Sequence, residues 1–325
     1  MMRTRMLVRS ATVAMALGAL ACKPDLGAPP SLIDGPRILA IRGAPPDAPP
    51  GTDITYDALI VDTNGRVASP NLGWAICLEP HPPAESNIVS SACFSGPEDA
   101  MGPTFTAPIS SGENDACSLF GPITPNPKPG QPPARPADAD VTGGYYEPVR
   151  LTWYEDTGDQ PMAFTLERII CRLANAASDV AGDFAMKYVP NNNPVIARVT
   201  LDPDGAATSL FDATQNALPA PGSVAAGQTV SLEAAWPDGT AESFLVYDVA
   251  SRTVVTQTEA LRLAWFVTGG DLQFDATGRS ETETETFTRN VWTAPTTPGP
   301  VHLWTVMRDS RGGIDFAEAE IDVTP

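Results

Sequence analysis

Residues 300–323 read PVHLWTVMRDSRGGIDFAEAEIDV, and this stretch decides how the rest of the chain is interpreted. Apolar and polar residues alternate on both sides of the turn DSRGG at 309–313. Such alternation is typical of a strand with one buried face, and Asp, Ser and Gly are favoured in turns. The stretch therefore predicts the closing hairpin of a β-sandwich.

The same outline recurs without a gap at residues 148–171. The identities are Pro148 with Pro300, Val149 with Val301, Leu151 with Leu303, and Phe164 with Phe316. Other pieces recur upstream in the same order, namely LGWAIC at 72–77 with LAWFVT at 263–268, and FTAP at 105–108 with WTAP at 292–295. A repeat of this kind predicts two related strand-rich domains, residues 36–192 and 193–325.

The repeated pieces are unequally spaced. FTAP and the hairpin at 148 are separated by a long segment, whereas WTAP is followed almost at once by the hairpin at 300. We therefore expect an insertion in the first domain at about 94–147. Seven prolines at 122–136 predict an extended loop within it, because proline cannot donate to a strand ladder. This loop is either a binding loop or a disulfide-pinned excursion.

Other segments complete the predicted architecture. Residues 244–248 and 252–257 look like two extra strands of the second domain, and 282–288 like an edge strand. Residues 175–187 have apolar positions at helical spacing, with Asn175 or Ser178 as the cap. The expected fold is all-β, with two sandwiches in tandem and one short helix near the domain junction.

The N-terminus predicts export. Three arginines precede a short run of small and apolar residues that ends at Cys22, which is the pattern of a secretory signal peptide at 1–21. Residues 19–22 (ALAC) resemble a bacterial lipobox, with Ala19 at the position that usually holds Leu. The resemblance implies lipidation of Cys22, a tether at 22–35, and an outer-membrane location on the periplasmic face or the cell surface; an ordinary cleaved signal is the alternative.

Charge restricts the partners. The chain has 20 basic and 39 acidic residues, and removal of residues 1–21 takes away three basic residues and no acidic one, which leaves a net charge of −22. Nucleic acid is excluded as a partner, because binding it requires clustered Lys and Arg. The expected partners are the membrane, through the lipid anchor, and an envelope protein or a glycan.

Four cysteines follow Cys22: Cys77, Cys93, Cys117 and Cys171. An even number in an exported chain predicts two disulfides. Spacing does not separate the three possible pairings, although a nested arrangement, with Cys93 bonded to Cys117, is the one we favour. Zinc is the competing interpretation, but no close cysteine pair of the kind that zinc ribbons use is present.

Residues for catalysis are few. His81 lies among prolines and His302 within an alternating strand, and neither is near a nucleophile-elbow motif. Turns at Asp202 and Asp309 offer oxygen ligands for calcium, but Asp-Gly turns are explained by backbone geometry alone. We expect no enzyme activity, no cofactor and no metal site. Tyr145 and Tyr146 follow two glycines and are candidates for an exposed contact with a protein or glycan.

The tryptophan strands, the Trp-Thr-Ala-Pro segment, the turn at 309–313 and the closing strand resemble bacterial immunoglobulin-like domains of the PKD and cadherin-like type. In such sandwiches a Trp on the third strand is buried, which assigns Trp74 and Trp265 to the cores. The resemblance implies a bacterial surface lipoprotein that presents sandwich domains without catalysis. A ligand-binding lipoprotein, with a pocket between the insertion and the second domain, is the alternative, and a hydrolase is a third possibility.

Overall fold

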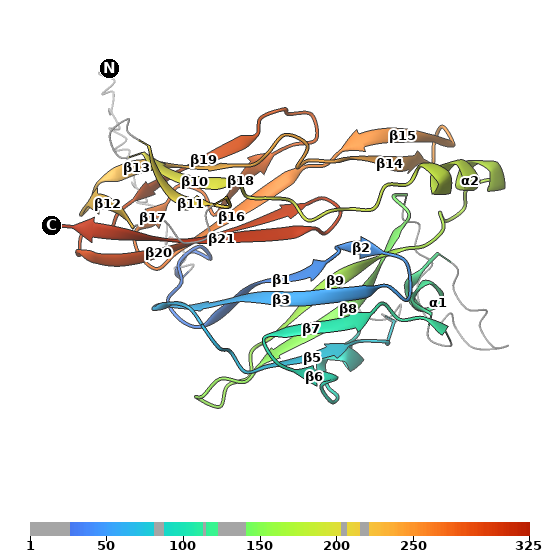
Figure 1. The fold of residues 1–325 in the computed structure, drawn as a ribbon, viewed down its shortest axis with the longest axis horizontal. Helices are drawn as coiled ribbons and strands as arrows, with labels where there is room; N and C mark the ends of the chain where they lie inside the picture. Colours follow the sequence, from blue (N-terminus) through green and yellow to red (C-terminus); the bar gives the residue numbers. More distant parts are fainter. Residues whose placement is uncertain (1–26, 81–87, 113–114, 123–140, 203–206, 215–220) are drawn as a thin grey trace, which may run out of the picture.

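The structure is a computed structural model that describes residues 27–80, 88–112, 115–122, 141–202, 207–214 and 221–325. In these ranges the fold is all-β, with two immunoglobulin-like sandwiches in tandem, as the sequence predicts (Figure 1). Its helices are η1 (Ser91–Phe94), α1 (Ala116–Phe120) and α2 (Ser178–Lys187). None of the helices within the described ranges is long and apolar enough to cross a membrane.

The first sandwich has two sheets. One contains β1 (Arg37–Ala44), β3 (Asp53–Asp62), β4 (Gly65–Arg66) and β7 (Thr104–Pro108), with β1 and β7 on either side of β3. The other has the order β2 (Asp47–Ala48), β9 (Met162–Ile170), β8 (Gly144–Trp153), β5 (Leu72–Ile76), β6 (Ala100–Met101).

The second sandwich also has two sheets, and a separate hairpin. The first sheet has the order β11 (Thr208–Asp212), β10 (Arg198–Asp202), β13 (Thr229–Ala235), β19 (Phe287–Thr293), β17 (Asp271–Leu272). The second has the order β12 (Gly222–Ala225), β21 (Ile314–Thr324), β20 (Gly299–Asp309), β16 (Leu261–Val267), β18 (Ala276–Arg279). The hairpin consists of β14 (Ser243–Asp248) and β15 (Thr253–Thr258).

The strand order of the first sandwich is repeated in the second. The path β2-β9-β8-β5-β6 corresponds to β12-β21-β20-β16-β18, and β1-β3-β7 corresponds to β10-β13-β19. In each sandwich a short early strand, β2 or β12, pairs in parallel with the last strand. The segments that resemble each other in sequence therefore occupy equivalent places in the two sheets.

The register of the two hairpins differs from the ungapped sequence match. Trp74 pairs with Leu151, whereas Trp265 pairs with Thr305. If the two tryptophans are equivalent, Leu151 corresponds to Thr305 and not to Leu303, which is a slip of two residues. Side chains alternate with a period of two, so a slip of this size leaves every inward-facing residue inward.

Each sandwich has its own core. Trp74 and Trp265 are fully buried, and their indole N–H groups donate to the Gly102 carbonyl at 2.9 Å and to Thr277 Oγ1 at 2.8 Å. The core role expected for the two tryptophans is therefore confirmed. A third buried indole, Trp292 on β19, donates to the Gly269 carbonyl at 3.0 Å.

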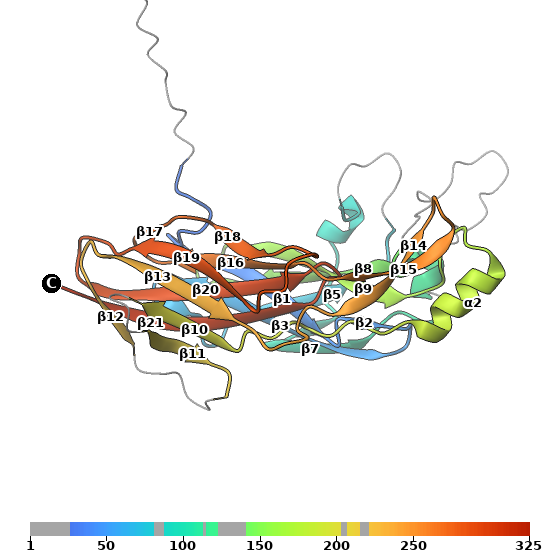
Figure 2. The ribbon, with the colours of Figure 1, turned by 90° about the horizontal axis from the view of Figure 1, so that it is seen from above.

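The two sandwiches lie side by side, so that four sheets stack in layers (Figures 1 and 2). The middle layers meet in an apolar cluster whose fully or nearly buried members come from both sandwiches: Ile33, Leu39, Ala40, Leu59, Val61, Trp304, Val306 and Ile314. Residues 58–61 of β3 and 303–307 of β20 are consequently buried on both faces. The apolar run at 58–61 (ALIV), and the run at 303–307 (LWTVM) that is interrupted only by Thr305, are the pattern of such strands.

Two local predictions are corrected. Helix α2 begins after Ala177, which makes no side-chain cap, while Asn175 adopts a left-handed conformation with φ 55°. Residues 282–286 are not a strand, because β19 begins at Phe287; Glu281, Glu283 and Glu285 lie in the preceding loop. Val180 and Phe184 of α2 do lie in one apolar cluster, as the spacing predicts, together with Tyr188, the residue after the helix.

Candidate functional site

The domain junction contains a hairpin that the first sandwich lacks. Strands β14 and β15 lie between β13 and β16, a place where the first sandwich has no corresponding hairpin between β3 and β5. Tyr247 on β14 is 5% exposed, and its N–H donates to the Val141 carbonyl at 2.7 Å. The cluster around it joins the hairpin, α2 and the end of the first sandwich; its other members are Leu173, Phe184, Val141, Ala176, Val180, Tyr188, Leu245 and Val254.

Arg311, in the turn of the closing hairpin, is the centre of a buried charged network. Its Nε donates to Glu259 Oε1 at 2.6 Å, one Nη to Glu242 Oε2 at 2.8 Å, and the other to the Val189 carbonyl at 3.0 Å. Arg311 is 2% exposed and Glu259 is 0% exposed. Burial, and then the charge of Asp309, raise the pKa of Glu259 to about 7, although Arg311 opposes the shift.

Asp309 begins the same turn, and its carboxylate accepts hydrogen bonds from groups of the turn and of the junction. Its Oδ1 accepts from the backbone N–H groups of Arg311 and Gly313, both at 2.8 Å. The side-chain amide of Asn191 donates to the same carboxylate at 3.1 and 3.3 Å. All its contacts therefore serve the turn and the junction, which agrees with the interpretation of residues 309–313 as a structural turn.

The Asn tract at 191–193 is bonded along its whole length. Asn192 Nδ2 donates to Glu242 at 2.6 Å, and Asn193 Nδ2 donates to the Gly43 carbonyl at 2.8 Å while its Oδ1 accepts from Ile314 N. The sequence marks this tract only as a boundary. The feature that could have indicated its role is the run of three Asn residues. Each amide side chain can both donate and accept hydrogen bonds, which suits a segment that passes from one domain to the other.

A second buried group lies at the adjoining end of the first sandwich. Glu147 and Glu167 stand opposite each other in the β8–β9 ladder and are 0% and 3% exposed. Burial, followed by the charges of Asp47 and Glu147, raises the pKa of Glu167 to about 8. The pKa of Glu147 is also raised by burial. Like charges directly opposite each other repel, so this pair favours a protonated Glu167 at neutral pH.

Arg168 and Asp47 connect the pair Glu147 and Glu167 to the junction between the two sandwiches. Arg168 Nε lies 3.6 Å from Asp47 Oδ2, and both side chains are nearly fully buried. Tyr188, which follows α2, donates its hydroxyl to Asp47, and Asn191 N donates to the same oxygen at 3.1 Å. A Cβ at Gly144 would lie 2.0 Å from Arg168 Cζ, so the glycine makes the room that the guanidinium occupies.

These groups hold charges and protons inside the junction, away from solvent. Within the described ranges, no group of three or more His, Cys, Asp or Glu side chains is arranged to hold a metal ion. The network can act only electrostatically. Its ion pairs and hydrogen bonds hold the two sandwiches in a fixed arrangement, and the protonation of Glu167 and Glu259 affects the stability of that arrangement.

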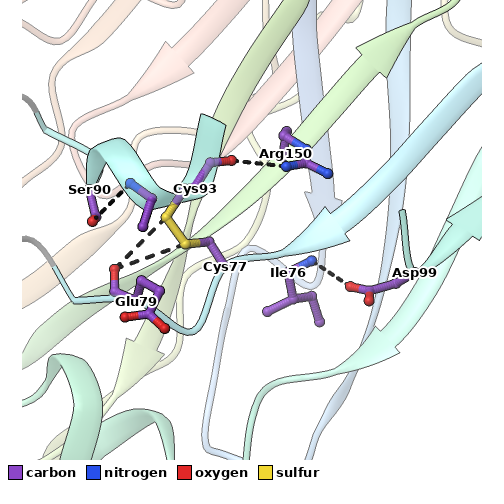
Figure 3. The surroundings of a disulfide bond; sticks show 8 residues. Ile76, Cys77, Glu79, Ser90, Cys93, Asp99 and Arg150 are labelled. Carbon is purple, nitrogen blue, oxygen red and sulfur yellow. Dashed lines mark hydrogen bonds between the residues drawn. A yellow bond between two sulfur atoms is a disulfide. The ribbon is translucent and has the colours of Figure 1, made fainter. Parts of the chain in front are cut away.

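The disulfides are Cys77–Cys93 and Cys117–Cys171 (Figure 3 shows the first). The prediction of two disulfides is confirmed, and the nested pairing is wrong. Cys77 follows β5 and Cys171 follows β9, with β8 between them. Two strand spacings, about 9–10 Å, exceed the Cα separation that a disulfide can bridge. The observed partners have Cα atoms 5.5 and 5.7 Å apart.

Residues 88–97, which Cys77–Cys93 links to the end of β5, cover part of the outer face of a sheet of the first sandwich. Arg150 of β8, 4% exposed, donates to the carbonyls of Cys93, Gly96 and Pro97, each at 3.0 Å (Figure 3 shows the first of these bonds). A cavity of about 190 Å³ lies beside the disulfide and Arg150. Because the guanidinium is occupied by backbone carbonyls, it anchors the loop.

Tyr145 is not the exposed contact residue that the sequence suggests. It is 0% exposed, because it lies on β8 with the inward-facing residues, and its hydroxyl donates to the Arg172 carbonyl at 3.3 Å. Tyr146 points to the other face and is half-buried, with its hydroxyl accepting from Arg168 at 3.2 Å. Both tyrosines therefore belong to the junction end of the sandwich. The sequence does not indicate this position, because Pro148 lies in the same strand and proline is uncommon inside strands.

A second cavity lies on the outer face of the second sandwich. It measures about 480 Å³ and is lined by Thr200, Asp202, Ala207, Ser231, Glu233 and Arg289. Arg289 forms an exposed ion pair with Glu233 at 2.8 Å, and its guanidinium carbon lies 4.7 Å from the centroid of the Phe287 ring. The residues that line each of these two cavities belong to a single sandwich.

The remaining predicted residues are placed as follows. Cys22, the signal peptide, His81 and residues 123–140 of the insertion lie outside the described ranges. His302 is on β20, where its ring stacks on Trp304 at 5.8 Å and lies 3.9 Å from Glu320. The disulfides are those of an extracellular or exported protein.

Comparison with protein-family models gave no match, and comparison with curated proteins gave none either. Among solved structures, the chain is similar to fibronectin(III)-like modules of CbhA from Clostridium thermocellum, at 9% identity and a TM-score of 0.20, over 88% of this chain and 94% of that one. It is similar to carbohydrate-binding modules of the β-sandwich superfamily at 9% identity and a TM-score of 0.21, over 89% and 92%.

A third similar structure is dimeric latent PorU from Porphyromonas gingivalis, at 11% identity and a TM-score of 0.22, over 89% of this chain and 24% of that one. At such TM-scores none of these likenesses supports an argument about ligand or function.

Proposed function

We propose that this chain is a non-catalytic, lipid-anchored protein of the cell envelope, which presents two coupled sandwiches for contact with a protein or a glycan. The observation that carries the proposal is the buried junction. The apolar cluster around Trp304 contains side chains of both sandwiches, and Arg311 ties the closing hairpin to Glu242, to Glu259 and to Val189 in the segment between the sandwiches. A rigid body of this kind keeps its outer faces in constant relative positions.

Export is supported by the two disulfides, and anchoring by the lipobox-like residues at 19–22. A lipid anchor with more than one chain holds a protein firmly at a membrane. The acidic surface opposes nonspecific adsorption to anionic lipids and nucleic acid, so contacts depend on particular faces of the sandwiches.

The anchor is tested by replacing Cys22 with Ser and separating membrane from soluble fractions. We expect wild type in the membrane fraction, extractable by detergent but not by high salt, and Cys22→Ser in the soluble fraction. If Cys22→Ser stays with the membrane, the anchor is refuted. Chemical crosslinking of intact cells followed by mass spectrometry then identifies the contacted protein.

The cavity on the second sandwich favours a second candidate, capture of a small hydroxylated ligand such as a sugar. Its walls combine acceptors, Asp202 and Glu233, with the donor Arg289. This candidate is tested by calorimetric titration with neutral monosaccharides and disaccharides, comparing wild type with Arg289→Ala. Equal heats from both proteins would rule this site out.

A further inference from the structure

Strand β15 is an edge of a hairpin that projects beyond the sandwiches. The hairpin lies at the end of the molecule that also carries α2, away from the C-terminus (Figures 1 and 2). Its other strand, β14, is covered, because Tyr247 N donates to the Val141 carbonyl at 2.7 Å. In the described ranges no strand pairs with the outer edge of β15.

The ladder determines which groups this edge presents. In an antiparallel pair, residues that do not exchange hydrogen bonds direct their N–H and C=O groups away from each other. Tyr247 uses its N–H outside the hairpin and pairs with Val254, so Val254 also faces outward. By alternation the same holds for Thr256 and Thr258. These three residues present a row of outward donors and acceptors.

The sequence of β15 suits pairing with an identical strand. Residues 253–258 read TVVTQT and carry no charge, whereas the whole chain has a net charge of −19. Two acidic copies repel each other over most of their surfaces, so an uncharged segment is where they can approach. Exposed edges normally carry charges or proline, which prevent such pairing. Val255 is 39% exposed and no residue of the strand blocks the edge in this way.

We propose that β15 pairs antiparallel with β15 of a second copy across a two-fold axis at Thr256. In this register Val254 faces Thr258 of the partner subunit, Thr256 faces its own equivalent, and all three outward-facing residues enter the ladder. Two hairpins become one four-stranded sheet. Cross-strand pairs of β-branched residues stabilise such a ladder, and a two-fold axis closes the assembly at two chains.

The test is Thr256→Cys in the full chain, exported by a bacterial host and analysed on non-reducing gels after mild oxidation. The two thiols would face each other at the axis, within the Cα separation that a disulfide spans. We expect a covalent dimer that reduction abolishes. Val249→Cys is the matched control: it is 60% exposed in the turn of the same hairpin, off the edge, and is expected to stay monomeric.

A second variant, Thr256→Lys, places two like charges opposite each other at the axis. It should reduce the dimer found by sedimentation of the detergent-solubilised chain, whereas Val249→Lys should not. A monomeric Thr256→Cys with both native disulfides intact overturns the proposal. So does equal crosslinking of the two cysteine variants, or an adduct at position 256 whose mass is that of a different protein.

Discussion

Arg311 Nε donates to Glu259 Oε1 at 2.6 Å, across the gap between the closing hairpin and the segment that follows β15. Both side chains are almost completely buried, so neither charge has water as an alternative partner. The same guanidinium holds Glu242 and the Val189 carbonyl, which makes one turn residue the point where three segments meet.

Replacement of Arg311 by Ala should lower the free energy of unfolding by about 3–5 kcal/mol, because it leaves buried carboxylates without their cation. Urea denaturation followed by tryptophan fluorescence measures the loss. The control is Arg289→Ala, which removes an exposed ion pair and should cost about 1 kcal/mol or less. If the two variants lose equal stability, the Arg311 network does not stabilise the junction.

Stability should fall as the pH rises from about 4.5 to about 8. The pKa of Glu167 is raised to about 8 by burial and by the charges of Asp47 and Glu147, so the folded chain binds a proton there that the unfolded chain has released. A native state that binds more protons loses stability with rising pH, and this contribution is fully present only below the unfolded pKa.

Glu167→Gln removes this proton and should flatten the pH dependence of the unfolding free energy, with a gain in stability near pH 8. Urea titrations between pH 5 and pH 8 provide the comparison. Glu281→Gln, at an exposed loop position, should leave the wild-type slope unchanged. A Glu167→Gln slope equal to that of wild type would show that Glu167 does not hold the proton.

Loss of the Cys117–Cys171 disulfide should cost more stability than loss of Cys77–Cys93. The sequence separations are 54 and 16 residues, and chain entropy assigns about 4 and about 3 kcal/mol to loops of these lengths. Paired Cys→Ser variants and urea denaturation measure the two losses. Peptide mapping without reduction checks the pairing itself; a peptide that joins Cys93 to Cys117 would contradict the structure.

Gly313→Ala should lower the free energy of unfolding by about 1–3 kcal/mol through overpacking. A Cβ at this position would lie 2.1 Å from Asp309 Oδ2 and 3.0 Å from the Asn192 carbonyl, and both belong to the junction. Gly182→Ala is the opposite control: its helical position is open, and alanine should stabilise α2 by up to about 1 kcal/mol. Thermal denaturation of the two variants should shift in opposite directions.

The sequence predicts most of the strands because alternation, turn residues and the repeated tryptophan segments all depend on neighbours along the chain. The Trp74 and Trp265 strands, for example, lie in equivalent places in the two sandwiches. The candidate contact residues were less predictable. Tyr145 follows two glycines as a loop residue would, yet it is the second residue of the buried strand β8, because the surroundings of a side chain depend on the sheet that packs over it.

By itself, then, the sequence determined the all-β class, the two sandwiches and the presence of two disulfides. Only the tertiary structure decided the disulfide partners, the register of Leu151 against Trp74, and the junction around Arg311. The physical reason is the same in each case. Alternation specifies the face on which a side chain lies and is unchanged by a slip of two residues, whereas pairing, register and burial between sheets depend on distances across the fold.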